Sequence, residues 1–182
     1  MRSRRRLKAA RLSFNVGLMK ITSCPGCGVQ LPALDGAVHR YIESSLACWA
    51  KYGELLAREY ENPEYMAAHR LTVDTYAVQH PGRPSPQSVQ SVAVHLISLH
   101  AVLELGLTQR DATNLIKRCA DAGQFIWLEP PRGSCALNVT HPLKATSANE
   151  HVVAVREWAS AAWQSWARYY GQVRSWAAAH GA

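Results

Sequence analysis

The chain has 182 residues, of which 48% are apolar and 18% are charged, and this balance predicts one globular domain and excludes a disordered chain. It contains no run of about 18 apolar residues, so we expect no segment to cross a membrane. Its net charge of +7 invites comparison with nucleic-acid-binding proteins, so the position of the basic residues matters.

The basic residues are concentrated at the start of the chain. Seven Lys and Arg side chains and no acid lie in residues 1–20, which leaves thirteen basic residues against thirteen Asp and Glu in residues 21–182. We expect 1–20 to be a basic tail that is disordered or lies upstream of the true start, which would be Met19. The alternative is an arm that binds nucleic acid or protein, and nucleic acid is expected as a partner only through this tail. The stretch after Lys8 is too polar for an export signal, so we predict a cytoplasmic protein.

After a tight turn at 24–28 and a loop at 31–38, the rest of the chain is predominantly helical. Caps, Pro at first helical positions, and Gly or Pro-Gly stops delimit the segments. The expected caps include Ser44 or Ser45, Asn62 and Ser147. The predicted helices cover 39–60 (with a second segment starting near Leu46), 62–80, 85–105, 108–123 and 147–179.

Residues 124–146 are the least helical part, and within them 125–128 and 136–139 are expected to be short strands or extended packing segments. The C-terminal helix is long, and its apolar stripe from Trp158 to Trp176 indicates core packing. We therefore predict a mainly α fold, in which 21–182 form a single domain: a helical bundle with an N-terminal zinc-knuckle loop and a long C-terminal helix.

Five cysteines carry the clearest chemistry. The sequence CPGCG at 24–28 is typical of a zinc knuckle, because two residues between the thiols let both sulfurs reach one ion, and the glycines let backbone N–H groups turn toward them. A closed structural site needs four ligands, and the nearest further donors along the chain are His39 and Cys48. The sequence therefore predicts a Cys3His zinc site of Cys24, Cys27, Cys48 and His39.

The alternatives to zinc are cysteines that bind no metal and occur at this spacing incidentally, and a redox Cys-x-x-Cys pair. Such a pair would normally open a helix after a strand in a thioredoxin-like unit, and no strand or βαβ pattern surrounds this one. A disulfide framework is not expected without a secretion signal. Cys119 is expected to be a small buried apolar residue, and Cys135 lies in a loop.

A second set of polar residues lies in the central helices. Because both helices rise equally per residue, an antiparallel pair would place His69 level with His95. These two imidazoles could bind a metal, share a proton or complete the cysteine site. His69 and His80 cannot share one ion, because eleven residues of helix separate them by roughly 16 Å. The alternative is that each histidine bonds to a carbonyl or carboxylate in the core, with Asp74 as one partner or as a salt bridge to Arg70.

Four strings of the sequence are similar to those of a known family. They are CPGCG at 24–28, HRYIESS at 39–45 leading to Cys48, LTVDTYAVQHPG at 71–82 and SVAVHL at 91–96, of which YAVQHPG is the most specific. On these strings the chain resembles an uncharacterised bacterial family, catalogued as a domain of unknown function, over about 21–178. The resemblance implies no activity or substrate. More loosely, the chain resembles metal-dependent four-helix bundles with histidines on facing helices.

These observations predict a zinc-binding helical protein of unknown biochemical role, with a mainly structural metal. One alternative is a metal-dependent enzyme with a pocket between the central helices, whose catalytic candidates are His69, Asp74, His80 and His95. The other is a nucleic-acid-binding or protein-binding module that uses the basic tail. The sequence lacks a P-loop, a Rossmann glycine motif, a G-x-S-x-G elbow and an H-E-x-x-H pair, so no reaction is indicated.

Overall fold

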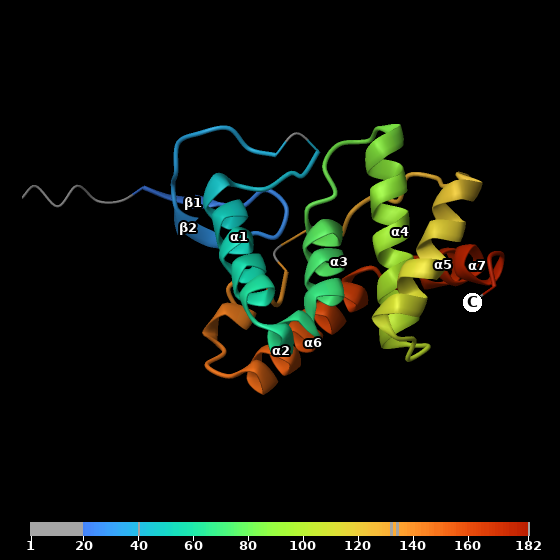
Figure 1. Ribbon diagram of the computed structural model, residues 1–182. Coiled ribbons are helices and arrows are strands. Elements are labelled where there is room, and N and C mark those ends of the chain that lie inside the picture. Colours follow the sequence, from blue (N-terminus) through green and yellow to red (C-terminus); the bar gives the residue numbers. More distant parts are fainter. Residues whose placement is uncertain (1–19, 40, 132, 134, 182) are drawn as a thin grey trace, which may run out of the picture.

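The computed structural model describes residues 20–181 apart from 40, 132 and 134. Within these residues the chain forms seven α-helices and one two-stranded sheet (Figure 1), which confirms the mainly α prediction. The basic tail lies outside the described residues apart from Lys20, so the roles expected of it stay predictions. The elements are β1 (Ile21–Ser23), β2 (Gln30–Pro32), α1 (Leu46–Glu61), α2 (Pro63–Met66), α3 (His69–Gln79), α4 (Pro86–Leu103), α5 (Gln109–Ala122), α6 (Ala148–Ser165) and α7 (Tyr170–Ala178), with 3-10 turns η1 (Pro142–Lys144) and η2 (Ala167–Tyr169).

An N-terminal hairpin carries the CPGCG turn. β1 and β2 pair antiparallel, with Thr22 opposite Leu31. The turn between them is closed by hydrogen bonds from Cys24 N to Val29 O and from Gly28 N to Cys24 O, both 2.9 Å. Gly28 has a φ of 77°, a conformation that glycine adopts without steric cost. These strands were not predicted from the sequence, because three residues are too few to show the alternation of apolar and polar residues that is typical of a strand.

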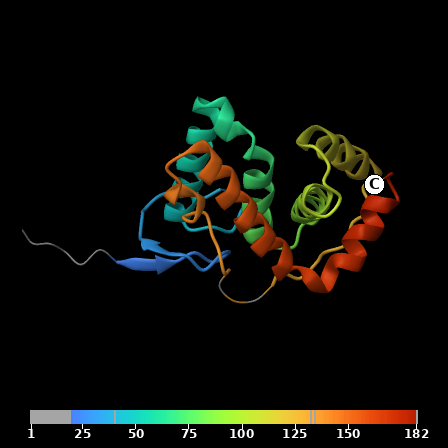
Figure 2. The same cartoon turned by 90° about the horizontal axis from the view of Figure 1, so that it is seen from below.

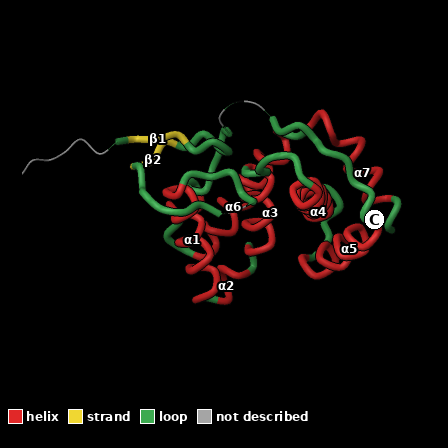
Figure 3. The backbone as a smooth tube through the Cα atoms, turned by 90° about the horizontal axis from the view of Figure 1, so that it is seen from above, coloured by secondary structure: helices red, strands yellow, loops and turns green. Residues whose placement is uncertain are grey.

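The helices form two adjacent apolar cores. One lies where α4 packs against α3, α5 and α7, and the other surrounds the cysteine turn and includes residues of α1 and α6. Figures 2 and 3 show α4, α5 and α7 grouped at one end of the molecule and the hairpin, α1 and α2 at the other, with α3 between them. The central position of α3 lets it contact both halves of the protein.

Although central, α3 is a polar helix. Its buried residues include Thr72, Asp74 and Gln79. Such groups are stable in a core only when they find hydrogen-bond partners. The Gln79 side chain shows how this is done, since its Nε2 donates to Leu137 O (2.8 Å) and its Oε1 accepts from the indole N–H of a tryptophan on α6 (2.9 Å). α3 is therefore joined to its neighbours by specific polar contacts as well as by apolar packing.

Two predicted helices are shorter or divided in the structure. The helix predicted over 39–60 begins only at Leu46, where the Ser45 hydroxyl accepts from the N–H of Cys48 and caps α1. The helix predicted over 62–80 is divided into α2 and α3 at residues 67–68. Asn62 caps α2 with Pro63 at its first position, as the sequence predicted.

The predicted single C-terminal helix is also divided. α6 ends at Ser165, and the η2 turn follows Trp166, whose φ and ψ of −95° and 13° depart from helical values. The reason lies in tertiary packing: α6 packs mainly against α3 and also touches α4, whereas α7 packs against α4 and α5. The change of direction at Trp166 brings the last part of the chain to α5.

The segment between α5 and α6 follows the second of its two predicted forms. Neither 125–128 nor 136–139 forms a strand, and both are extended packing segments with Leu128 and Val139 buried. Among the described residues, no helix is long and apolar enough to cross a membrane.

Candidate metal centre

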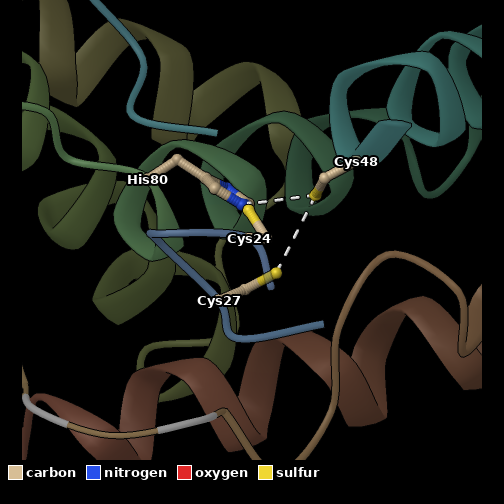
Figure 4. Close-up of side chains that lie close together, drawn as sticks. All are labelled: Cys24, Cys27, Cys48 and His80. Carbon is tan, nitrogen blue, oxygen red and sulfur yellow. Dashed lines mark hydrogen bonds between the residues drawn. The ribbon is translucent and has the colours of Figure 1, made fainter. Parts of the chain in front are cut away.

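Four potential metal ligands converge where the hairpin meets α1 and α3 (Figure 4). They are Cys24 and Cys27 from the hairpin turn, Cys48 from the first turn of α1, and His80 from the end of α3. Their donor atoms all lie within 4.8 Å of one another, and none of the four residues is more than 2% exposed. This Cys3His group could hold a metal ion.

The hairpin turn approaches the end of α3 very closely. A Cβ atom at Gly26 would lie 2.5 Å from Cδ2 of His80, 2.6 Å from the carbonyl oxygen of Gln79 and 2.7 Å from that of Glu43. Glycine at this position therefore allows the two cysteines that flank it to reach His80. From the sequence we expected the glycines to let backbone N–H groups turn toward the thiols. The steric role of Gly26 depends on the tertiary approach to α3, so the sequence alone did not indicate it.

The imidazole of His80 is held with one nitrogen ready for a metal. Its Nδ1 lies 2.7 Å from the carbonyl oxygen of Tyr76, and because a carbonyl only accepts, Nδ1 carries the proton. Nε2 then presents a lone pair toward Cys48 Sγ, 3.5 Å away. A ligating histidine commonly has its other ring nitrogen fixed in this way.

Two separations between the donor atoms match those expected around a tetrahedral zinc ion. Zn–S bonds of about 2.3 Å and a Zn–N bond of about 2.0–2.1 Å place two sulfurs roughly 3.8 Å apart, and a sulfur and a nitrogen roughly 3.5 Å apart. The Sγ atoms of Cys27 and Cys48 are 3.8 Å apart, and Cys48 Sγ is 3.5 Å from His80 Nε2. A disulfide would need its sulfurs about 2 Å apart.

The three thiols influence each other's ionisation. Hydrogen bonds from Cys27 and Cys48 lower the pKa of Cys24, and the interaction with Cys24 raises the pKa of Cys27 and raises that of Cys48 to about 12. One negative charge in the buried cluster thus disfavours a second. A divalent cation would change this balance, because it binds thiolates and displaces their protons.

His39, the fourth ligand that the sequence predicted, lies outside this group. It is exposed, its ring centroid lies 5.0 Å from that of Trp49, and its Nδ1 accepts from the N–H of Tyr41. The prediction took the histidine nearest in sequence, whereas His80 follows Cys48 by 32 residues. The sequence carried one signal that could have pointed to His80: the Pro-Gly pair that follows it ends the helix and places His80 at the helix terminus.

The four catalytic candidates belong to three separate networks. His80 is in the cysteine group, and His95 Nδ1 bonds to Asp74 Oδ1 at 2.7 Å. Asp74 also accepts from Arg70 Nε, so both alternatives considered for this aspartate occur. His69 is not paired with His95, since its Nδ1 bonds to a carboxylate of α1, Glu59, at 2.8 Å. The antiparallel register predicted residue 69 or 70 level with His95, whereas the residue that His95 contacts is Asp74, about one helical turn further along α3.

A buried glutamate forms a network that the sequence analysis missed. Glu59 on α1 is 0% exposed, and it accepts from the hydroxyl of Thr72 on α3. Its two carboxylate oxygens contact His69 Nδ1 and His151 Nε2, at 2.8 and 3.0 Å. Since His151 lies 92 residues from Glu59 on α6, no local pattern could have predicted the contact. The network joins three helices through one carboxylate.

Comparison with known proteins places the chain in a family. The sequence pattern of DUF5946, a family of unknown function, matches residues 22–167. The chain belongs to DUF5946. This confirms the resemblance noted from the sequence, and the DUF5946 region contains all four residues of the Cys3His group. Searches among curated proteins and among solved structures found no significant match.

Proposed function

We propose that this DUF5946 protein binds one Zn²⁺ through Cys24, Cys27, Cys48 and His80, and that the metal is structural. The observation that supports the proposal is a buried set of four protein donors, two of whose separations match those around a tetrahedral zinc ion. Catalytic zinc sites keep one position open for water or substrate, whereas structural sites are filled by four protein ligands.

The N-terminal segment has little apolar core of its own. Within residues 20–45, and leaving out residue 40, the buried side chains are Cys24, Cys27 and Ser44. Attachment of the hairpin to α1 and α3 therefore depends on the two cysteines. Structural zinc contributes on the order of 10 kcal/mol to the folding of small zinc-binding peptides, which is ample to hold such a segment.

The experiment is metal analysis of the chain expressed with zinc available, followed by chelation. We expect one zinc per chain, and we expect chelation or Cys24→Ser to increase amide hydrogen exchange in residues 20–45 more than in α4. Cys135→Ser is the matched control, because the N–H of Cys135 bonds to Cys27 O at 3.1 Å but its thiol is not in the group. Protein without zinc, or exchange that chelation leaves unchanged, would contradict the proposal.

A further inference from the structure

One residue that is not a ligand contacts two of the proposed ligands in three ways. Tyr76 is 0% exposed, and its carbonyl oxygen accepts from Nδ1 of His80. Its ring stacks on the imidazole of His80, with centroids 4.0 Å apart and planes at 27°. Its hydroxyl donates to Sγ of Cys48 at 3.6 Å. Backbone and side chain of one helical residue thus act on the same two donors.

The three sulfurs receive their hydrogen bonds from different sources. Cys24 Sγ accepts from the N–H of Ser45 at 3.4 Å, and Cys27 Sγ lies within hydrogen-bond distance of Cys48 Sγ, at 3.8 Å. The donor to Cys48 is a side-chain hydroxyl, that of Tyr76, and the N–H of Cys48 is engaged with the Ser45 side chain. A side-chain substitution can therefore remove the hydrogen bond to Cys48 and leave those to the other two cysteines.

We propose that Tyr76 is a positioning residue of the metal centre, whose hydroxyl stabilises the Cys48 thiolate and whose carbonyl and ring direct Nε2 of His80 to the metal. This inference rests on the proposed zinc site. Three thiolates and one neutral imidazole around Zn²⁺ carry a net charge of −1. In a buried site that charge is stabilised by hydrogen bonds to the sulfurs, because water is excluded.

The phenol is suited to this role, because a tyrosine O–H can donate a hydrogen bond to a sulfur, and the hydroxyl of Tyr76 lies 3.6 Å from Cys48 Sγ. Tyr52 offers a close comparison, since its ring stacks on that of Tyr76 at 3.9 Å and is also buried, but among the described residues its hydroxyl makes no hydrogen bond to the four ligands and its ring does not stack on His80. Substitutions at the two tyrosines can therefore distinguish the effect of the hydrogen bond to Cys48 from the effect of aromatic packing.

The test compares Tyr76→Phe with Tyr52→Phe in the full chain. Zinc affinity is measured by competition with a chromophoric chelator, and the sulfur-to-metal charge-transfer band is recorded after Co²⁺ substitution. We expect Tyr76→Phe to weaken zinc binding by about 10–100-fold and to shift the band, as loss of a contact to a ligand does. In Tyr76→Phe, we also expect iodoacetamide to alkylate Cys48 ahead of Cys24 and Cys27. Tyr52→Phe should match the parent chain in zinc affinity, charge-transfer band and alkylation order.

The failure of this inference can be told from failure of the zinc site. If the parent chain binds no zinc, the site itself is refuted. If the parent binds zinc and Tyr76→Phe keeps its affinity, band and alkylation order, only the role of Tyr76 is refuted.

Discussion

Replacement of Gly26 by alanine tests the close approach between the hairpin turn and α3. The new Cβ would lie 2.5 Å from His80 Cδ2 and 2.6 and 2.7 Å from two backbone oxygens, so relief requires a shift of roughly 1 Å of the turn or of the imidazole. Overpacking of this kind costs about 1–3 kcal/mol. If the metal-bound state carries that strain, zinc binding weakens by roughly 5- to 150-fold.

The measurement is zinc affinity by chelator competition, with denaturant unfolding of the zinc-bound chain beside it. Gly53→Ala on α1 is the matched control, because a Cβ there meets nothing within 4 Å. Alanine is the better helix former, so this control should keep its zinc affinity and gain stability, by up to about 1 kcal/mol. Unchanged zinc affinity in Gly26→Ala would refute the claim that the glycine is needed for the turn to reach His80.

Three further predictions concern ligand choice, the buried glutamate and acid stability. His80→Ala should lose zinc and His39→Ala should retain it, measured by metal analysis of the two purified variants. The reverse result would identify His39, and not His80, as the fourth ligand. Glu59→Gln should lower the free energy of unfolding by about 1–3 kcal/mol, because it leaves buried partners unmatched, and a change below about 0.5 kcal/mol in denaturant titrations would contradict this. Hydrogen bonds from Arg174, with a smaller contribution from Trp163, lower the pKa of Glu104 to about 2 from 4.5. The stabilisation from Glu104 should therefore be complete above pH 4.5 and be lost as pH falls toward 2. Glu104→Gln should flatten the pH dependence of the free energy of unfolding in that window. If the parent and the variant gave parallel curves of unfolding free energy against pH, the prediction would be wrong.

The sequence predicted those parts of the fold that depend on local signals. Ser45, Asn62 and Ser147 cap helices as expected, since a cap needs only the residues of one turn. The division of the C-terminal helix near Trp166 was missed, because it follows from the different partners of α6 and α7. Residues within α6 and α7 keep a continuous apolar spacing across the break, so periodicity alone could not show it.

The candidate site was predictable to the extent that its ligands are close in sequence. Cys24 and Cys27 form a recognisable pair, and Cys48 follows within the next helix. The choice between His39 and His80 depends on how α3 is placed against the hairpin, which only the tertiary structure gives. Contacts of Glu59 with helices α3 and α6 were hidden for the same reason.

X-ray absorption spectroscopy at the zinc edge of the purified chain tests the central claim most directly. The account predicts one zinc per chain with three sulfur ligands at about 2.3 Å and one nitrogen at about 2.0–2.1 Å. The imidazole scattering should disappear in His80→Ala and persist in His39→Ala. A shell of oxygen ligands, or a zinc-free protein from zinc-supplied cells, would contradict a closed site at Cys24, Cys27, Cys48 and His80.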